Sequence, residues 1–152
     1  MALPEQPSTD HSLELFTVLS RAHNWVHAHA TRDIRRYGLN PTEFGILELL
    51  YHKGPLPLQQ IGEKILISSG NITYCINKLA DRQLLVRQPA HNDRRITFAE
   101  LTPQGRRLLD EIFPQHESAL RNAMDGLSDE EQAQAICLLK KLGLAARERF
   151  HS

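Results

Sequence analysis

The spacing of apolar residues divides the chain into helical segments interrupted by one pair of strands. Over residues 9–37, two apolar stripes run along a single long predicted helix, which suggests two packing partners. Gly38 ends this helix, because glycine readily adopts the left-handed backbone that closes helices. Asn40, Pro41 and Glu43 then supply an N-cap, a first-turn proline and a capping-box acid, so a second helix is expected to begin here.

Two further helices are predicted after a break at Gly54. The first is short, over residues 58–65, and the second covers residues 68–82 with Ser68 as its cap. Four apolar residues at spacings of three and four form the inward face of the second helix: Ile72, Cys75, Ile76 and Leu79. Two helices joined by a short turn are typical of a helix-turn-helix.

The opposite face of this fourth helix is polar. It carries short hydrogen-bonding groups, one aromatic ring and one lysine, namely Asn71, Thr73, Tyr74, Asn77 and Lys78. Such groups read base edges in the major groove or fix phosphates. Ser68 and Ser69 at the start of the helix also leave backbone N–H groups open to a phosphate oxygen. The alternative is a plain solvated helix face, and the basic hairpin that follows favours DNA.

The hairpin is predicted from strand patterns at residues 84–89 and 95–101. Alternation places four apolar side chains toward the body of the protein: Leu84, Val86, Ile96 and Phe98. Arg87, Arg94 and Arg95 do not fit an apolar face, and an arginine at the turn can reach into a minor groove. Asp93 is placed to hold a neighbouring arginine by a charge-assisted hydrogen bond. The alternative is an ordinary solvated hairpin tip.

Two more helices complete the chain. Thr102 and Pro103 open a fifth, in which Pro114 is expected to cause a kink rather than a stop before about residue 124. Ser128 and Glu131 form the capping box of a sixth, which ends at about residue 150. Its apolar stripe has no further chain to cover it, so we expect the first, fifth and sixth helices to pack against a second subunit. A monomeric bundle is the alternative.

Composition and charge narrow the class. At 152 residues the chain is expected to form one domain. Its formal net charge is zero, but residues 58–107 hold eight basic against four acidic side chains, so this segment is +4 and the remainder −4. Two separated cysteines without a CxxC pair suit a reducing compartment. We find no signal peptide pattern and no apolar run of membrane-spanning length, so a cytoplasmic protein is expected.

Enzymatic motifs are missing from the sequence. There is no GxSxG, no HExxH and no glycine-rich phosphate loop, so we expect neither catalysis nor a cofactor. A protein-interaction adaptor is the alternative function, because a winged helix can lose DNA binding and keep a protein-binding face. The two arginines at the predicted wing tip favour DNA.

The run DRRITFAELTPQGRRLL, preceded by INKLADRQLLVRQP, resembles the MarR family of multiple antibiotic resistance regulators. The resemblance covers about residues 39–109, and its specific parts are the Asp93-Arg94-Arg95 tip and the LTPQG junction at residues 101–105. It implies a homodimeric winged helix-turn-helix repressor that binds a palindromic operator and is released by a small molecule or an oxidant. It assigns the recognition helix to residues 68–82 and the wing to residues 84–101, with Arg94 or Arg95 entering the minor groove.

The expected fold is therefore mainly α with a small β wing, in one domain spanning residues 1–152. Residues 40–101 form the winged helix-turn-helix lobe, and residues 9–37 and 103–150 supply the dimerisation helices. The segment ILISSGNITYCINKL at residues 65–79 is also similar to the branch of the family that responds to catechols and quinones.

The sequence leaves three kinds of signal to consider for the control of DNA binding: a metal ion, an oxidant and a small molecule. His23 and His27 lie one helical turn apart, a spacing that can share a metal, but no ligand nearby completes a set, so no metal site is predicted. Cys75 on the inward face is an inert buried thiol or, if oxidised, a redox switch. An apolar, phenolic or quinone-like effector is the third, in a pocket lined by aromatic and imidazole side chains that also suit an ordinary core: His23, Trp25, Phe44, Tyr51 and Phe113.

Overall fold

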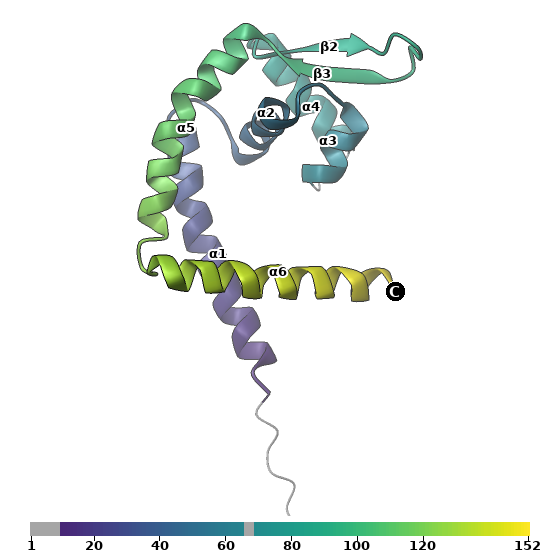
Figure 1. Ribbon diagram of the computed structural model, residues 1–152. Helices are drawn as coiled ribbons and strands as arrows, with labels where there is room; N and C mark the ends of the chain where they lie inside the picture. Colours follow the sequence, from purple (N-terminus) through teal and green to yellow (C-terminus); the bar gives the residue numbers. More distant parts are fainter. Residues whose placement is uncertain (1–9, 66–68) are drawn as a thin grey trace, which may run out of the picture.

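The computed structural model describes residues 10–65 and 69–152, so the N-terminal arm and the expected cap Ser68 lie outside the described residues. Within this part of the chain, helices and three short strands follow the order α1 (Ser12–Arg35), α2 (Pro41–Lys53), β1 (Leu56–Pro57), α3 (Leu58–Ile65), α4 (Ser69–Asp81), β2 (Leu85–Pro89), β3 (Thr97–Leu101), α5 (Pro103–Ala123) and α6 (Asp129–His151) (Figure 1). The expected mainly α fold with a small β wing is confirmed.

The chain is arranged as a lobe and an arm. Helices α2, α3 and α4 form the lobe together with the sheet, and the β2–β3 hairpin projects from it as the wing (Figure 1). Helices α1 and α5 run side by side away from the lobe, and α6 turns off steeply at the far end of α5 (Figure 1). No residue of α6 is buried.

The predicted helix signals act as expected. Asn40 accepts a hydrogen bond from the Glu43 backbone N–H and forms a complete capping box at the start of α2. Ser128 and Glu131 do the same for α6. Pro114 lies inside α5, which continues through it, as predicted.

One apolar core holds the lobe together. The largest fully buried side chains come from five elements: Ile46, Leu47 and Leu50 of α2, Ile61 of α3, Ile76 and Leu79 of α4, Leu85 of β2, and Leu109 and Ile112 of α5. The expected inward face of α4 is confirmed, since Ile72 and Cys75 are buried as well. Burying the apolar side of α4 fixes which of its residues remain outside.

The sheet differs from its prediction in two respects. Three antiparallel strands have the order β1-β3-β2, including a short β1 that the sequence pattern did not reveal. Leu85 and Ala99 are buried, whereas Val86 is 39% and Ile96 42% exposed, so their predicted inward orientation is wrong. Leu84 is buried as predicted, but it belongs to the turn after α4, where Gln83 adopts a positive φ of 61°, and the strand alternation starts one residue later at Leu85.

The turn also joins α4 to α5. The Thr102 hydroxyl donates to the Gln83 carbonyl over 2.6 Å and accepts from the Gly105 N–H over 3.0 Å. A Cβ at Gly105 would stand 2.0 Å from the carbonyl oxygen of Leu84, so only glycine fits there. The LTPQG segment is thus the joint that sets the wing against the arm.

Candidate nucleic-acid interface

Helix α4 presents a polar face on the outside of the lobe. Asn71, Thr73, Asn77 and Lys78 are exposed, and Tyr74 is 65% exposed although aromatic. These side chains follow from the burial of Ile72, Cys75, Ile76 and Leu79 on the other side. Ser69 begins the helix, and its side chain lies outside the described part of the structure. An exposed helix with short polar groups has the form of a major-groove reader.

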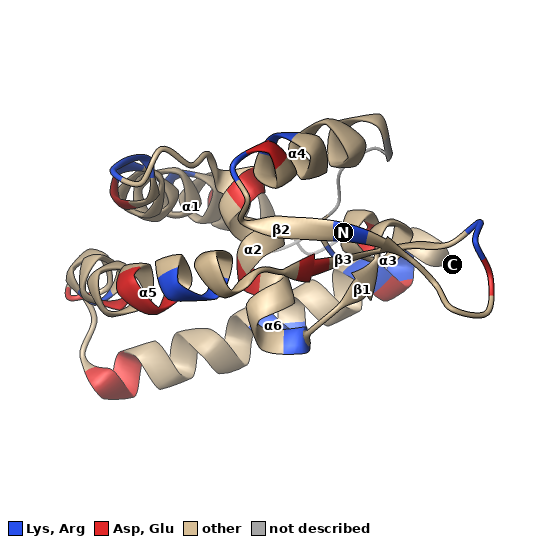
Figure 2. Ribbon diagram, turned by 90° about the horizontal axis from the view of Figure 1, so that it is seen from above, with Lys and Arg blue, Asp and Glu red and all other residues tan. Residues whose placement is uncertain are grey.

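Asn77 on this face is bound by the wing. Arg87 of β2 donates from Nη1 to Oδ1 of Asn77 over 2.7 Å. The contact follows from the strand register, because Arg87 lies on the same face of β2 as the buried Leu85 and pairs with Ala99 of β3. This face is turned toward α4, which lies beside β2 (Figure 2). The sequence predicted that Arg87 would not share the apolar face of the hairpin. In the structure it lies on the same face of β2 as Leu85, but its side chain is exposed.

Lys78 has a partner inside the lobe. Its Nζ lies 3.7 Å from Oε1 of Glu43, whose side chain is only 3% exposed, and 6.0 Å from the ring centroid of Tyr74. Within the described residues, the other carboxylate oxygen of Glu43 is buried without a hydrogen-bond partner. Glu43 therefore does more than cap α2, because it also anchors a cation of the recognition helix.

The wing tip carries two exposed arginines. Asp93 accepts hydrogen bonds from the Arg95 backbone N–H and from its Nε, at 3.0 and 3.1 Å. These bonds from Arg95 lower the pKa of the Asp93 carboxyl. The Arg95 side chain remains 91% exposed, and Arg94 is exposed beside it. Figure 2 shows this charged tip at the end of the hairpin, well clear of the lobe.

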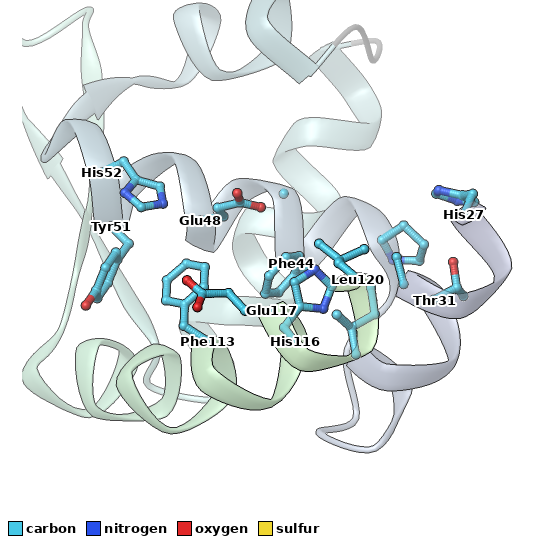
Figure 3. A pocket seen from close by; sticks show the side chains of 14 residues that line it. His27, Thr31, Phe44, Glu48, Tyr51, His52, Phe113, His116, Glu117 and Leu120 are labelled. Atoms are coloured by element: carbon cyan, nitrogen blue, oxygen red, sulfur yellow. The ribbon is translucent and has the colours of Figure 1, made fainter. Parts of the chain in front are cut away.

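A pocket opens where α1, α2 and α5 meet. It has a volume of about 640 Å³, and Figure 3 shows the side chains that line it. Phe44, Tyr51 and Phe113 line it, as the sequence suggests. His23 and Trp25 do not, and the side chain of Trp25 is 75% exposed on α1. Polar lining residues that sequence reasoning missed are His27, Thr31, Glu48, His52, His116 and Glu117.

His116 of the pocket lining is paired with a buried aspartate. His116 Nδ1 of α5 lies 3.1 Å from Oδ2 of Asp33 in α1, and both side chains are buried. The His116 ring also contacts Phe44, with ring centroids 4.8 Å apart. Tyr51 donates to Asp110 of α5, and this hydrogen bond raises the pKa of the Tyr51 hydroxyl. The pocket wall is therefore tied to both long helices.

The two cysteines have different settings. Cys75 is buried on the inward face of α4, and this burial, together with the nearby Glu43 carboxylate, raises the pKa of its thiol. Cys137 is exposed on α6. His23 and His27 stack at 5.4 Å, but no group of three potential metal ligands occurs within the described residues. Among the described helices, none is long and apolar enough to span a membrane.

Comparison with known proteins agrees with this geometry. Residues 39–97 match the MarR family profile. The chain is 49% identical to the HTH-type transcriptional regulator MhqR of Bacillus subtilis, over 95% of this chain and 99% of that protein. The structure of Bordetella bronchiseptica BpsR is 27% identical with a TM-score of 0.77, over 86% of this chain and 98% of that one. Sco3205 of Streptomyces coelicolor, solved with DNA, shares the fold at 21% identity and a TM-score of 0.81, over 91% of this chain and 92% of that one. The wing, the recognition helix and these similarities together show that the chain belongs to the MarR family.

Proposed function

We propose that this protein is a sequence-specific double-stranded DNA-binding transcriptional regulator that acts as a repressor. The observation that carries the proposal is the pairing of an exposed polar α4 with a wing that ends in Arg94 and Arg95. The rigid junction at Thr102 and Gly105 holds the wing at a fixed place relative to α4. A helix in the major groove and an arginine in the adjacent minor groove require such fixed spacing.

A homodimer would complete the binding unit. Helix α6 buries no residue within this chain, yet it exposes large apolar side chains including Ile136, Leu139 and Leu142. Helix α1 likewise exposes Phe16 and Trp25. Apolar surface of this extent on two helices of one chain is typical of a subunit interface. Two copies joined there would present two recognition helices to a palindromic operator.

The pocket suggests a small aromatic effector. Phe44 and Phe113 offer apolar ring faces, while the buried Thr31 hydroxyl has no hydrogen-bond partner within the described residues. Glu48 and Glu117 also line the pocket, so a carboxylate ligand would meet like charge there. A neutral phenolic or quinone-like molecule fits this lining better. The DNA binding of BpsR is regulated by 6-hydroxynicotinic acid, which supports an aromatic effector here, but without the carboxylate that Glu48 and Glu117 would repel.

Binding to the DNA upstream of the gene that encodes this chain tests the proposed function. The wild-type affinity should fall steeply with salt, because lysine and arginine contacts release counterions from phosphates. Arg94→Ala and Arg95→Ala should each weaken binding, whereas Arg121→Ala on α5 removes the same charge from the arm and should have little effect. Affinity that is insensitive to salt and to both wing variants would support the adaptor alternative instead.

The effector requires its own measurement. Phenols, quinones and zinc should be titrated separately into the preformed protein–DNA complex. A neutral phenol or quinone should release the DNA, and Thr31→Val should raise the concentration needed about fivefold by removing the pocket hydroxyl. Thr17→Val is the matched control, because Thr17 lies on α1 outside the pocket lining. Release by zinc alone would overturn the proposed effector class.

A further inference from the structure

The contact between Arg87 and Asn77 determines what α4 can offer to DNA. A guanidinium group has five N–H donors and no acceptor. The group within 2.7 Å of Arg87 Nη1 must therefore be the carbonyl oxygen of the Asn77 amide, as the structure has it. The amide NH2 group, which lies on the other side of the same planar group, is left to face away from Arg87.

A free asparagine has no such preference. Its amide can turn either edge outward, and it commonly pairs with adenine by accepting from N6 and donating to N7. In this protein the guanidinium takes one of the two lone pairs of the amide oxygen and places a positive charge beside it. An adenine N6 donor approaching the remaining lone pair would meet the positive guanidinium at close range, which disfavours that contact.

We infer that Arg87 is a positioning residue that turns the NH2 donor of Asn77 outward, toward the acceptor edge of a guanine. In the major groove, guanine presents two acceptors, N7 and O6, whereas adenine presents one acceptor and one donor. The Asn77 NH2 group, which Arg87 turns outward, supplies a donor that suits the acceptors of guanine. This inference rests on the proposed function, because it assumes that α4 enters a major groove.

The position of Arg87 supports a role separate from the wing tip. It belongs to β2 within the paired part of the hairpin, opposite Ala99, and not to the turn that carries Arg94 and Arg95. The small side chain of Ala99 leaves room for the arginine to extend along the sheet toward α4. The wing therefore has two tasks in this protein, a minor-groove contact at its tip and the orientation of a major-groove side chain at its base.

Selection of operator sequences from a randomised library, with the full-length protein, tests the inference. Wild-type protein should enrich guanine at one position of each half-site. Arg87→Met frees the amide, so adenine should be accepted there and the guanine-to-adenine ratio should fall about tenfold. Gln88→Met, on the opposite face of the same strand, is the matched control and should leave the selected sequence unchanged.

A double variant separates positioning from direct reading. Asn77→Ala should abolish the preference at that position, and Arg87→Met added to Asn77→Ala should change it no further. Melting temperatures of all variants confirm that each is folded before selection. Should Arg87→Met lower the affinity for every sequence equally, or still alter the preference without Asn77, the inference would be overturned. A wild-type protein that enriches no sequence would overturn the proposed function as well.

Discussion

Lys78 Nζ, on the exposed face of α4, lies 3.7 Å from Oε1 of Glu43, which is buried in α2. Removing the lysine leaves a buried carboxylate without its counter-charge. Lys78→Met should therefore lower the free energy of unfolding by about 1 kcal/mol, a modest figure because the lysine is half exposed. Urea denaturation measures this change.

The same pair permits an internal control. Glu43→Gln removes the charge that Lys78 neutralises, so Lys78→Met should cost little when Glu43→Gln is already present. The sum of the two single changes should exceed the cost of the double change. An equal cost of Lys78→Met in both backgrounds would show that the two side chains are not coupled.

Gly105 is expected to be intolerant of any side chain. Gly105→Ala forces a methyl group onto the Leu84 carbonyl oxygen, 2.0 Å from the ideal Cβ position. We expect a loss of about 3 kcal/mol in the free energy of unfolding, together with weaker DNA binding, because the wing is displaced. Gly126→Ala is the control, since nothing lies within 4 Å of its Cβ position. Calorimetry should show a large drop in melting temperature for the first variant only.

Asp93 should stay ionised at acidities where an ordinary aspartate is protonated. Its hydrogen bonds from Arg95 lower its pKa below the usual 3.8. The lowered pKa means that the Asp93–Arg95 contact is present at neutral pH and is lost only as pH falls through that reduced value. A pH titration followed by carbon-13 NMR of the Asp93 carboxyl group should have its midpoint below pH 3.8 in the wild type. Arg95→Ala should return it toward the usual value, and an unchanged midpoint would contradict the contact.

Cys75 should react slowly with alkylating agents. Burial on the inward face of α4 raises the pKa of its thiol, so the reactive thiolate is scarce at neutral pH. In a Cys137→Ser variant, mass spectrometry should detect little iodoacetamide adduct until urea unfolds the protein. Rapid labelling in the folded state would show that α4 opens readily, and would revive the redox interpretation of this residue.

Subunit association should depend on the apolar stripe of α6. Sedimentation velocity of the wild type should give about twice the 17.3 kDa mass of one chain. Leu139→Glu places a charge in the stripe and should shift the protein toward the monomer. Gln134→Glu adds the same charge on another side of α6 and should not. A monomeric wild type would refute the proposed dimer.

Local signals made most of the helices predictable. The capping boxes at Asn40 and Ser128 depend on residues three positions apart, so they are visible in the sequence. The inward face of α4 followed from spacing alone. The strand faces were not predictable in the same way, because the left-handed backbone at Gln83, a residue that rarely adopts it, shifted the alternation by one position.

Tertiary contacts account for what the sequence did not reveal. Glu43 was identified as a capping acid, but its contact with Lys78 depends on how α2 crosses α4. Arg87 was recognised as basic, and only the strand register brings it to Asn77. Phe44, Tyr51 and Phe113 of the predicted set line the pocket, whereas Trp25 does not and His27 stands in place of His23. The point along α1 at which it packs against α2 and α5 decides this, and no local pattern encodes that point.

Arg82, at the end of α4, donates to the carbonyl oxygens of Gly38 and Tyr37, at 2.9 and 3.2 Å. This side chain therefore connects the C-terminal end of α4 to the segment that follows α1. In a dimer built on α1 and α6, these hydrogen bonds of Arg82 would transmit any change in the angle between the two arms to α4 of each subunit. The distance between the two copies of α4 would then depend on how the arms cross. A ligand bound beside α1 could change that distance, and so weaken the fit to the two half-sites, without contacting α4 or the wing.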